Sequence, residues 1–360
     1  MYYYFLMELS KERILITGGC GYIGSHTSLL LLEMGYSIVI VDSNINSSPK
    51  ILDKIHQILL DKSIDIKEKL TFYKGDIRDY SFLNNIFEKE KAIGNNISFV
   101  IHFAGLKSVS FSKSKPLEYW DVNIGGTINL LRVMQSFECK SIIFSSSATV
   151  YQPTKNLLLT ENDKLKPINP YGNTKEAIEK FLKDIFDSSE TNFKIASLRY
   201  FNPIGAHFSG LIGENPIGNP NNIFPIICNV GAGQQPFLEV YGNDWDTADG
   251  TCIRDYVHVM DVALGHIKTL EFLLKNNHQY LIMNLGTGKG TSVLELIDKF
   301  QNVNNIEIPY KFTPRRKGDT ANVIADNTLL FETLGWKPTK NIEAMCKEGW
   351  RWKMNYPNGF

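Results

Sequence analysis

The stretch of residues 14–25 constrains this chain most, because it runs from an apolar segment through three glycines into a helix. Residues 14–16 are a short apolar run, and Gly18, Gly21 and Gly24 follow at intervals of three. A buried strand, a glycine turn and a helix N-terminus direct backbone N–H groups and the helix dipole at one point. The stretch therefore predicts a site for the diphosphate of a dinucleotide.

A carboxylate ends the second apolar run. Residues 37–41 precede Asp42, which lies about eighteen residues after Gly24. A carboxylate there can accept hydrogen bonds from ribose hydroxyls, which favours NAD over NADP. The alternative is a glycine-rich turn before an ordinary helix. The strand, the helix and the terminal acid together favour the dinucleotide site.

Apolar strands alternate with amphipathic helices through the first part of the chain. We expect strands at residues 37–41, 70–73, 98–103 and 141–145, and helices at residues 25–35, 51–69, 123–137 and 171–186. This alternation predicts an α/β fold with a Rossmann-type, doubly wound parallel sheet. Ligands bind at the carboxyl ends of such strands, where Asp42, Asp76, Ala104-Gly105 and Ser145–Ser147 fall.

The composition changes after Phe201. Residues 202–224 are rich in Gly, Pro and Asn and show little periodicity, which is typical of a binding loop or a flexible connection. Helical and strand patterns return at 262–274 and 280–285. We predict a dinucleotide-binding domain of residues 1–200 plus about 255–288. A smaller interleaved α/β substrate domain takes about 201–254 plus 289–360.

Composition excludes several classes of function. The 360 residues carry 38 basic and 38 acidic side chains, so no global charge attracts nucleic acid or an anionic membrane. The five cysteines are scattered without a CxxC motif, which argues against a disulfide framework or a metal site and fits a reducing compartment. Residues 1–9 are apolar but too short to span a bilayer and lack a basic start. We expect a soluble cytoplasmic protein without a metal.

Tyr171 and Lys175 lie on one face of the helix that Pro170 opens, because positions i and i+4 are neighbours. An ammonium ion beside a phenol lowers the phenol pKa from about 10, so Tyr171 is a candidate general base. The alternative is an exposed tyrosine with a solvated lysine. The serines of residues 145–147, at the end of a predicted strand upstream, favour the catalytic interpretation.

A series of segments in this order resembles the UDP-glucose 4-epimerase family (also called UDP-galactose 4-epimerases) of the extended short-chain dehydrogenase/reductase superfamily. They are residues 16–26, 75–78, 100–109, 115–119, 144–151, 170–175, 198–207, 254–261, 284–288 and 314–319. The resemblance implies reversible C4 epimerisation of UDP-galactose and UDP-glucose through a 4-keto intermediate, with transient reduction of bound NAD, in galactose metabolism. It also implies a homodimer formed through helices at about 122–137 and 172–187.

The resemblance assigns roles to matching positions. It implies that Tyr171 removes the sugar O4 proton, that Ser147 positions O4, and that Lys175 binds a ribose and tunes Tyr171. The implied NAD contacts are Gly18, Gly21, Tyr22, Ile23, Gly24, Asp42, Asn44, Asp76, Ile77, Phe103, Ala104, Gly105, Lys107, Asn123, Ser145, Tyr171, Lys175 and Tyr200. The implied UDP-hexose contacts are Lys107, Ser147, Tyr171, Phe201, Asn202, Asn222, Leu238, Tyr241, Arg254, Arg316 and Asp319.

Three features depart from the family pattern. About ten extra residues precede the first strand, and we assign them no role. Asn173 and Thr174 replace small or basic residues, which we expect to matter little on an exposed helix face. Val323 stands where a bulky tyrosine narrows the sugar pocket of the family, so we predict some activity on UDP-GlcNAc and UDP-GalNAc.

Two alternatives remain. A nucleotide-sugar 4,6-dehydratase resembles this chain but uses an Asp-Glu pair beside the strand-end hydroxyl, where this chain has Ala148-Thr149. An idle NAD-binding or RNA-binding scaffold would have no need of Ser147, Tyr171 and Lys175 together.

Overall fold

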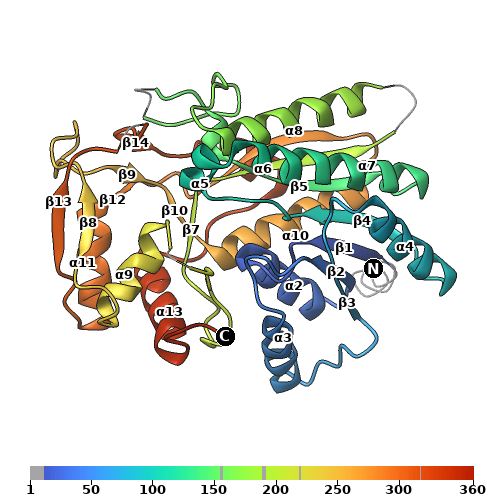
Figure 1. The fold of residues 1–360 in the computed structure, drawn as a ribbon, viewed down its shortest axis with the longest axis horizontal. Coiled ribbons are helices and arrows are strands. Elements are labelled where there is room, and N and C mark those ends of the chain that lie inside the picture. Colours follow the sequence, from blue (N-terminus) through green and yellow to red (C-terminus); the bar gives the residue numbers. More distant parts are fainter. Residues whose placement is uncertain (1–11, 155–156, 189–191, 219, 317) are drawn as a thin grey trace. The chain divides into compact units, whose positions relative to one another are not determined.

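The computed structural model describes residues 12–154, 157–188, 192–218, 220–316 and 318–360 (Figure 1). The extension before the first strand and its apolar start lie outside these residues. The chain divides into two compact units, and unit 1 comprises the chain up to Ser146, Asn169–Leu198 and His266–Ile282. Unit 2 comprises Ser147–Ile168, Arg199–Gly265 and Met283–Phe360. Residues 147–168, 199–200, 255–265 and 283–288 group with unit 2, whereas the sequence-based boundaries count them with the dinucleotide-binding domain.

A seven-stranded sheet in the order β11-β6-β5-β4-β1-β2-β3 is the centre of the fold. Its strands are β1 (Arg13–Thr17), β2 (Ser37–Asp42), β3 (Leu70–Lys74), β4 (Ile97–His102), β5 (Ser141–Ser147), β6 (Lys194–Tyr200) and β11 (Tyr280–Leu285). Pairing is parallel from β3 through β2, β1 and β4 to β5. Strand order runs outward from β1 in both directions, so the predicted doubly wound fold is confirmed. Ligands bind where the order reverses, at the carboxyl ends of β1 and β4.

The helices before β6 are α2 (Tyr22–Glu33), α3 (Lys50–Asp61), α4 (Tyr80–Ala92), α5 (Val109–Ser114), α6 (Pro116–Tyr119), the π-helical turn η1 (Trp120–Gly125), α7 (Gly126–Ser136) and α8 (Pro170–Asp187). The helix predicted over residues 51–69 begins one residue earlier, at Lys50, and ends earlier, at Asp61. Ser63 adopts a left-handed conformation with φ +60°, which a helix cannot continue through. The apolar stripe of this helix ends at Leu59, close to where the helix itself ends.

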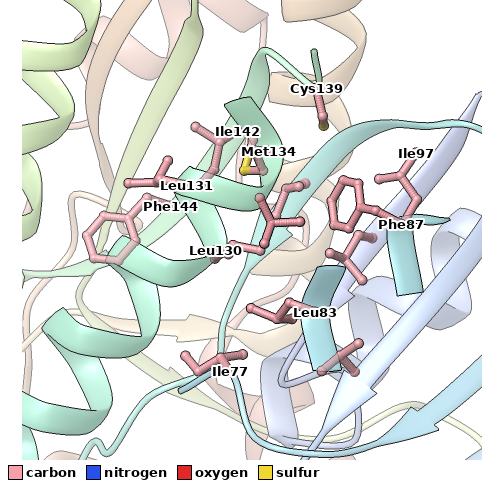
Figure 2. Packing of buried hydrophobic residues seen from close by; sticks show 14 of the residues in the cluster. Ile77, Leu83, Phe87, Ile97, Leu130, Leu131, Met134, Cys139, Ile142 and Phe144 are labelled. Carbon is pink, nitrogen blue, oxygen red and sulfur yellow. The ribbon is translucent and has the colours of Figure 1, made fainter. Parts of the chain in front are cut away.

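The core of unit 1 lies between the sheet and helices α4, α7 and α8. Leu83 and Phe87 of α4 and Leu130 and Met134 of α7 gather with Ile142 of β5, all at most 2% exposed (Figure 2). The opposite face is covered too, because Ile14 and Ile16, which alternate with Leu15 along β1, are fully buried. Burial on both faces explains why the strands read as continuous apolar runs.

Unit 2 has its own core, in which α9, α11 and α13 cover β8 and β10. Its elements are η2 (Ala148–Val150), β7 (Asn202–Ile204), α9 (Ile223–Gly231), β8 (Leu238–Tyr241), β9 (Ile253–Arg254), β10 (Tyr256–His258), β12 (Thr291–Ser292), α11 (Val293–Asn304), β13 (Tyr310–Thr313), β14 (Asn322–Val323), α12 (Thr328–Leu334) and α13 (Ile342–Asn355). Helix α10 (Val259–Lys275) continues from unit 2 into unit 1. None of the described helices is long and apolar enough to cross a membrane.

Candidate active site

The glycine loop between β1 and α2 leaves no room for side chains. Gly18 has φ +72°, and a Cβ there would lie 2.7 Å from the backbone nitrogen of Ala104. A Cβ on Gly24 would lie 2.3 Å from the carbonyl oxygen of Gly18. Helix α2 has no side-chain cap and no acidic residue in its first turn, so the N–H groups of residues 22–24 face outward for an anion. This cradle fits a diphosphate.

Asp42 organises the loop as well as ending β2. One carboxylate oxygen accepts from the backbone N–H of Cys20 at 2.9 Å. The other accepts from the Asn44 backbone at 2.9 Å and from Ser47 Oγ at 2.8 Å. A carboxylate has about four acceptor sites, so capacity remains for a ribose hydroxyl. Sequence reasoning named Asn44 but missed Ser47, which has no motif of its own.

Of the two predicted adenine contacts, Asp76 and Ile77, only Asp76 has a polar side chain. Arg78 binds the Asp76 carboxylate through two nitrogens at 2.7–3.1 Å and reaches Asp121 at 2.7 Å. The hydrogen bonds from Arg78 hold the pKa of Asp76 below its usual value. Ile77 is buried in the core of unit 1, where a Cβ on Gly126 would meet it at 2.5 Å.

Helix α8 holds Tyr171 and Lys175 as the spacing predicts. Asn169 caps the helix by accepting from the Gly172 N–H at 2.8 Å. Lys175 is 4% exposed, its Nζ lies 5.8 Å from the Tyr171 ring centroid, and it donates to the Ser145 carbonyl at 2.7 Å. Burial lowers the pKa of Lys175 to about 7, and the charge of Glu179 opposes this shift. Lys175 therefore loses its proton more easily than an exposed lysine does.

A buried chain of hydrogen bonds leads from the end of β1 toward η1. His102 Nδ1 lies 2.6 Å from Thr17 Oγ1, and its Nε2 lies 2.9 Å from Thr127 Oγ1. Thr127 donates its hydroxyl proton to the Asn123 carbonyl at 2.5 Å. Its oxygen must then accept from Nε2, which assigns the tautomer and leaves Nδ1 to accept from Thr17. Burial lowers the pKa of His102 to about 3, so the ring is neutral.

The chain of hydrogen bonds continues through the side chain of Asn123 to α8. Asn123 accepts from the Leu106 N–H at 2.8 Å and donates to the Leu106 carbonyl at 3.1 Å and to Thr174 Oγ1 at 3.0 Å. Thr174 donates to the Tyr171 carbonyl at 2.7 Å. The expectation that Thr174 lies on an exposed face is wrong, because this side chain is fully buried; Asn173 is exposed. The i, i+3 spacing from Tyr171 was the available signal.

Two further predicted cofactor residues of unit 1, Ala104 and Gly105, lie next to this chain of hydrogen bonds. The Phe103 ring lies 4.8 Å from the His266 ring, and the Ala104 N–H donates to Thr17 at 3.3 Å. Gly105 has φ +157°, and a Cβ there would lie 3.0 Å from Asn123 Oδ1. Tyr22 and Ile23 form the first turn of α2, and Lys107 is exposed.

In unit 2, Ser147 lies at the start of η2 with its proton available. Its Oγ accepts from the Thr149 backbone N–H at 3.2 Å and from Thr149 Oγ1 at 3.0 Å. Because these bonds use the oxygen as acceptor, the Ser147 hydroxyl proton can be donated. Thr149, which sequence reasoning considered only as a departure from a dehydratase, orients this hydroxyl.

Two guanidinium groups of unit 2 come from separate segments. Arg254 donates to the carbonyls of Ile253 and Thr320 at 2.8 and 2.9 Å. Arg316 pairs with Asp319 at 3.0 Å and lies 4.5 Å over the Tyr241 ring. Guanidinium groups fixed by carbonyls and a carboxylate are suited to binding a diphosphate.

The other predicted substrate residues are spread over unit 2. Asn222 precedes α9 and donates to Glu214 at 3.2 Å, whereas the side chain of Leu238 is 2% exposed in the core. Phe201 is buried directly after β6, and Asn202 opens β7. Tyr200, a predicted NAD contact, is buried as the last residue of β6. Val323 pairs in parallel register with Arg254 and packs against the cluster that contains Phe201.

Known proteins similar to this chain share its full length. The sequence profile described as GDP-mannose 4,6 dehydratase matches residues 15–349. A UDP-glucose 4-epimerase of Dictyostelium discoideum is 44% identical over 354 residues, 98% of this chain and 99% of that protein. This chain belongs to the UDP-glucose 4-epimerase family.

Solved structures agree with that assignment. An epimerase from Stenotrophomonas maltophila, with bound NAD and formylated UDP-arabinopyranose, superposes with a TM-score of 0.90 at 41% identity and covers 96% of this chain and 99% of its own. One from Bifidobacterium longum, in complex with NAD+ and UDP, has a TM-score of 0.89 at 42% identity and covers 97% and 100%. Although one matching profile carries a dehydratase name, this epimerase has Ala148 and Thr149 in place of the acid pair of that reaction.

Proposed function

We infer that this epimerase interconverts UDP-galactose and UDP-glucose by oxidising C4 of the hexose and reducing it again while NAD stays bound. The observation that carries the inference is the buried Lys175 beside Tyr171 on α8, with Ser145 at the end of β5 accepting from the ammonium group. This arrangement is that of a general base tuned by a cation. The name of the relatives supports UDP-glucose as substrate, and the ligands of the neighbouring structures support NAD as cofactor and a UDP group on the substrate.

In this proposal the chain holds NAD through the start of α2, Asp42 and Lys175. NAD held by these residues would supply the oxidising power, as the acceptor and later the donor of the C4 hydride. Tyr171 accepts the O4 proton, which leaves a 4-keto sugar, and later gives the proton back to O4. Ser147 donates to O4 and keeps it directed at Tyr171. Lys175 stabilises the phenolate through its charge.

Inversion at C4 requires that the keto sugar present its other face. The UDP group stays fixed by Arg254 and Arg316, while Asp319 accepts from the uridine ribose. Charged contacts at the diphosphate and weaker ones at the hexose allow the sugar to turn without leaving. Val323 leaves more room than a tyrosine would, and we propose that N-acetylated UDP-hexoses are also substrates.

The assignment of Tyr171 is tested by steady-state assay. We expect Tyr171→Phe to lose at least about a hundredfold of turnover on UDP-galactose, because general base catalysis contributes that much or more. The melting temperature should stay near that of wild type, since the ring remains. Turnover close to wild type in Tyr171→Phe would exclude it as the base.

We further propose a homodimer formed through α7 and α8, as the resemblance implies. Exposed apolar side chains on α5–α7 support it, namely Phe111, Leu117, Trp120 and Ile128. We also propose a cytoplasmic location. All five cysteines lie in the described part of the chain, and each is buried and free, which fits a reducing compartment.

A further inference from the structure

Helix α8 carries a third ionisable side chain on its catalytic face. Tyr171, Lys175 and Glu179 occupy positions i, i+4 and i+8, which share one side of a helix. Glu179 is 3% exposed and Lys175 is 4% exposed. A carboxylate is seldom buried this deeply without a partner, because desolvation disfavours its charge.

The strand end beside this face is held by both charged residues. Lys175 donates to the Ser145 carbonyl at 2.7 Å. Ser146 Oγ donates to Glu179 Oε1 at 2.5 Å, and Ser146 is fully buried. The two successive strand residues are therefore fixed by two successive turns of α8, immediately before Ser147 in the chain.

Among the groups around Lys175, Glu179 is the one whose negative charge can stabilise the ammonium ion. From β5 it meets the Ser145 carbonyl and, at 4.7 Å, the Phe144 ring. From β4 the nearby ionisable group is His102, which is neutral. From its own helix it meets Tyr171, whose ring also lies 6.5 Å from Tyr119 of α6. Burial lowers the pKa of Lys175, and Glu179 is the group whose charge raises it.

We propose that Glu179 is a positioning residue that keeps the buried Lys175 protonated and fixes the end of β5 beside Tyr171. The proposal rests on the proposed function, since it gives the ammonium group a task there. Glu179 itself does not touch the reacting atoms. It acts because a positive charge removed from water is stabilised by a nearby negative one.

The test follows the protonation of Lys175 directly. Full-length protein labelled with carbon-13 at lysine Cε is titrated by NMR, and the Lys175 signal is assigned by its absence in Lys175→Met. We expect Glu179→Gln to lower the titration midpoint by about 1 pH unit, because one nearby opposite charge shifts a pKa by about that much or more. A midpoint that stays or rises would overturn the proposal.

Glu176→Gln is the matched control. Glu176 lies one turn earlier on α8 and pairs with Lys180 at 2.8 Å on the surface, so its loss should leave the Lys175 midpoint in place. An equal fall in Glu176→Gln would contradict a specific role for Glu179. If Glu179→Gln does not fold, Glu179→Asp is titrated instead. Its withdrawn carboxylate should give a smaller fall, and an unchanged or higher midpoint there would equally count against the proposal.

The pH profile of turnover separates this inference from the proposed function. Lys175 acts in its protonated form, so activity is present below its pKa and is lost as pH rises through it. Glu179→Gln should move this alkaline limb downward together with the NMR midpoint, whereas an unmoved limb would overturn the inference. A wild-type protein that does not epimerise UDP-galactose would refute the proposed function, while the NMR titration would still decide the role of Glu179.

Discussion

Val323 is the residue where we expect the substrate range to be set. It is half-buried, stands opposite Arg254 in the β14–β9 pair, and packs against the cluster that contains Phe201. We expect a side chain with this placement to limit the space next to a predicted substrate contact. Its neighbours Phe201 and Ala325 are buried and cannot easily move aside.

Val323→Tyr should therefore lower kcat/KM for UDP-GalNAc by about tenfold or more relative to UDP-galactose, since even one methylene that a pocket must accommodate is worth about 1–3 kcal/mol and an N-acetyl group is larger. Parallel assays on the two substrates measure the ratio. Val323→Thr keeps the shape of the side chain and should keep the ratio. A ratio unaffected by the tyrosine would show that the N-acetyl group binds elsewhere.

The residues that the sequence could identify are those with a local spacing. Gly18, Gly24, Tyr171 and Lys175 follow from short-range patterns, because the backbone between them fixes their relation. Glu179 and Thr174 were missed as functional candidates, since their roles depend on what faces α8. The helical period predicts which side chains share a face of the helix. It does not predict which strand or turn packs on that face.

At the scale of elements, the π-helical turn η1 links the loop after β4 to α8 through hydrogen bonds of one side chain. It places Asn123 where one amide meets the Leu106 backbone and Thr174 together. The sequence predicted an ordinary helix over residues 123–137, because a π-turn changes the hydrogen-bond ladder without interrupting the apolar stripe. Such turns often occur at functional sites.

Thr174→Val tests this connection. It removes one buried acceptor from Asn123 at nearly constant volume, so we expect a loss of about 1–3 kcal/mol in the free energy of unfolding, the cost of an unsatisfied buried donor. Turnover should fall as well, because the Tyr171 carbonyl loses its tether. Denaturant unfolding and steady-state assays measure both. Asn173→Ala, on the exposed face, should change neither, and equal effects in the two variants would refute the connection.

At the scale of the whole molecule, alternation of strands and helices was enough to predict the doubly wound sheet. The interleaving of two units was predicted in outline, but their boundaries depend on long-range contacts. Residues 147–168 follow β5 directly in the sequence and still belong to unit 2, where Tyr151 donates to Asn284 at 2.5 Å. No local pattern carries a contact between residues so far apart in the chain.

The proposed dimer is tested at this scale. Ile128 on α7 is 37% exposed, and Ile128→Glu would bury a charge in the proposed interface. Sedimentation velocity should give a dimer for wild type and mainly monomer for the variant. Ile93→Glu, at a position that is 67% exposed at the end of α4, should remain dimeric. A monomeric wild type, or a dimer unaffected by Ile128→Glu, would contradict the proposed interface.

In the proposed function, one hydride leaves C4 and returns to the same carbon within one turnover. The most direct measurement uses UDP-galactose with deuterium at C4, incubated with purified enzyme in ordinary water without added reductant, followed by NMR of the UDP-glucose formed. We expect a product that retains its deuterium at C4, with no release to solvent and no dehydrated sugar. Loss of the label to water, or its transfer to C6 with elimination of water, would contradict it.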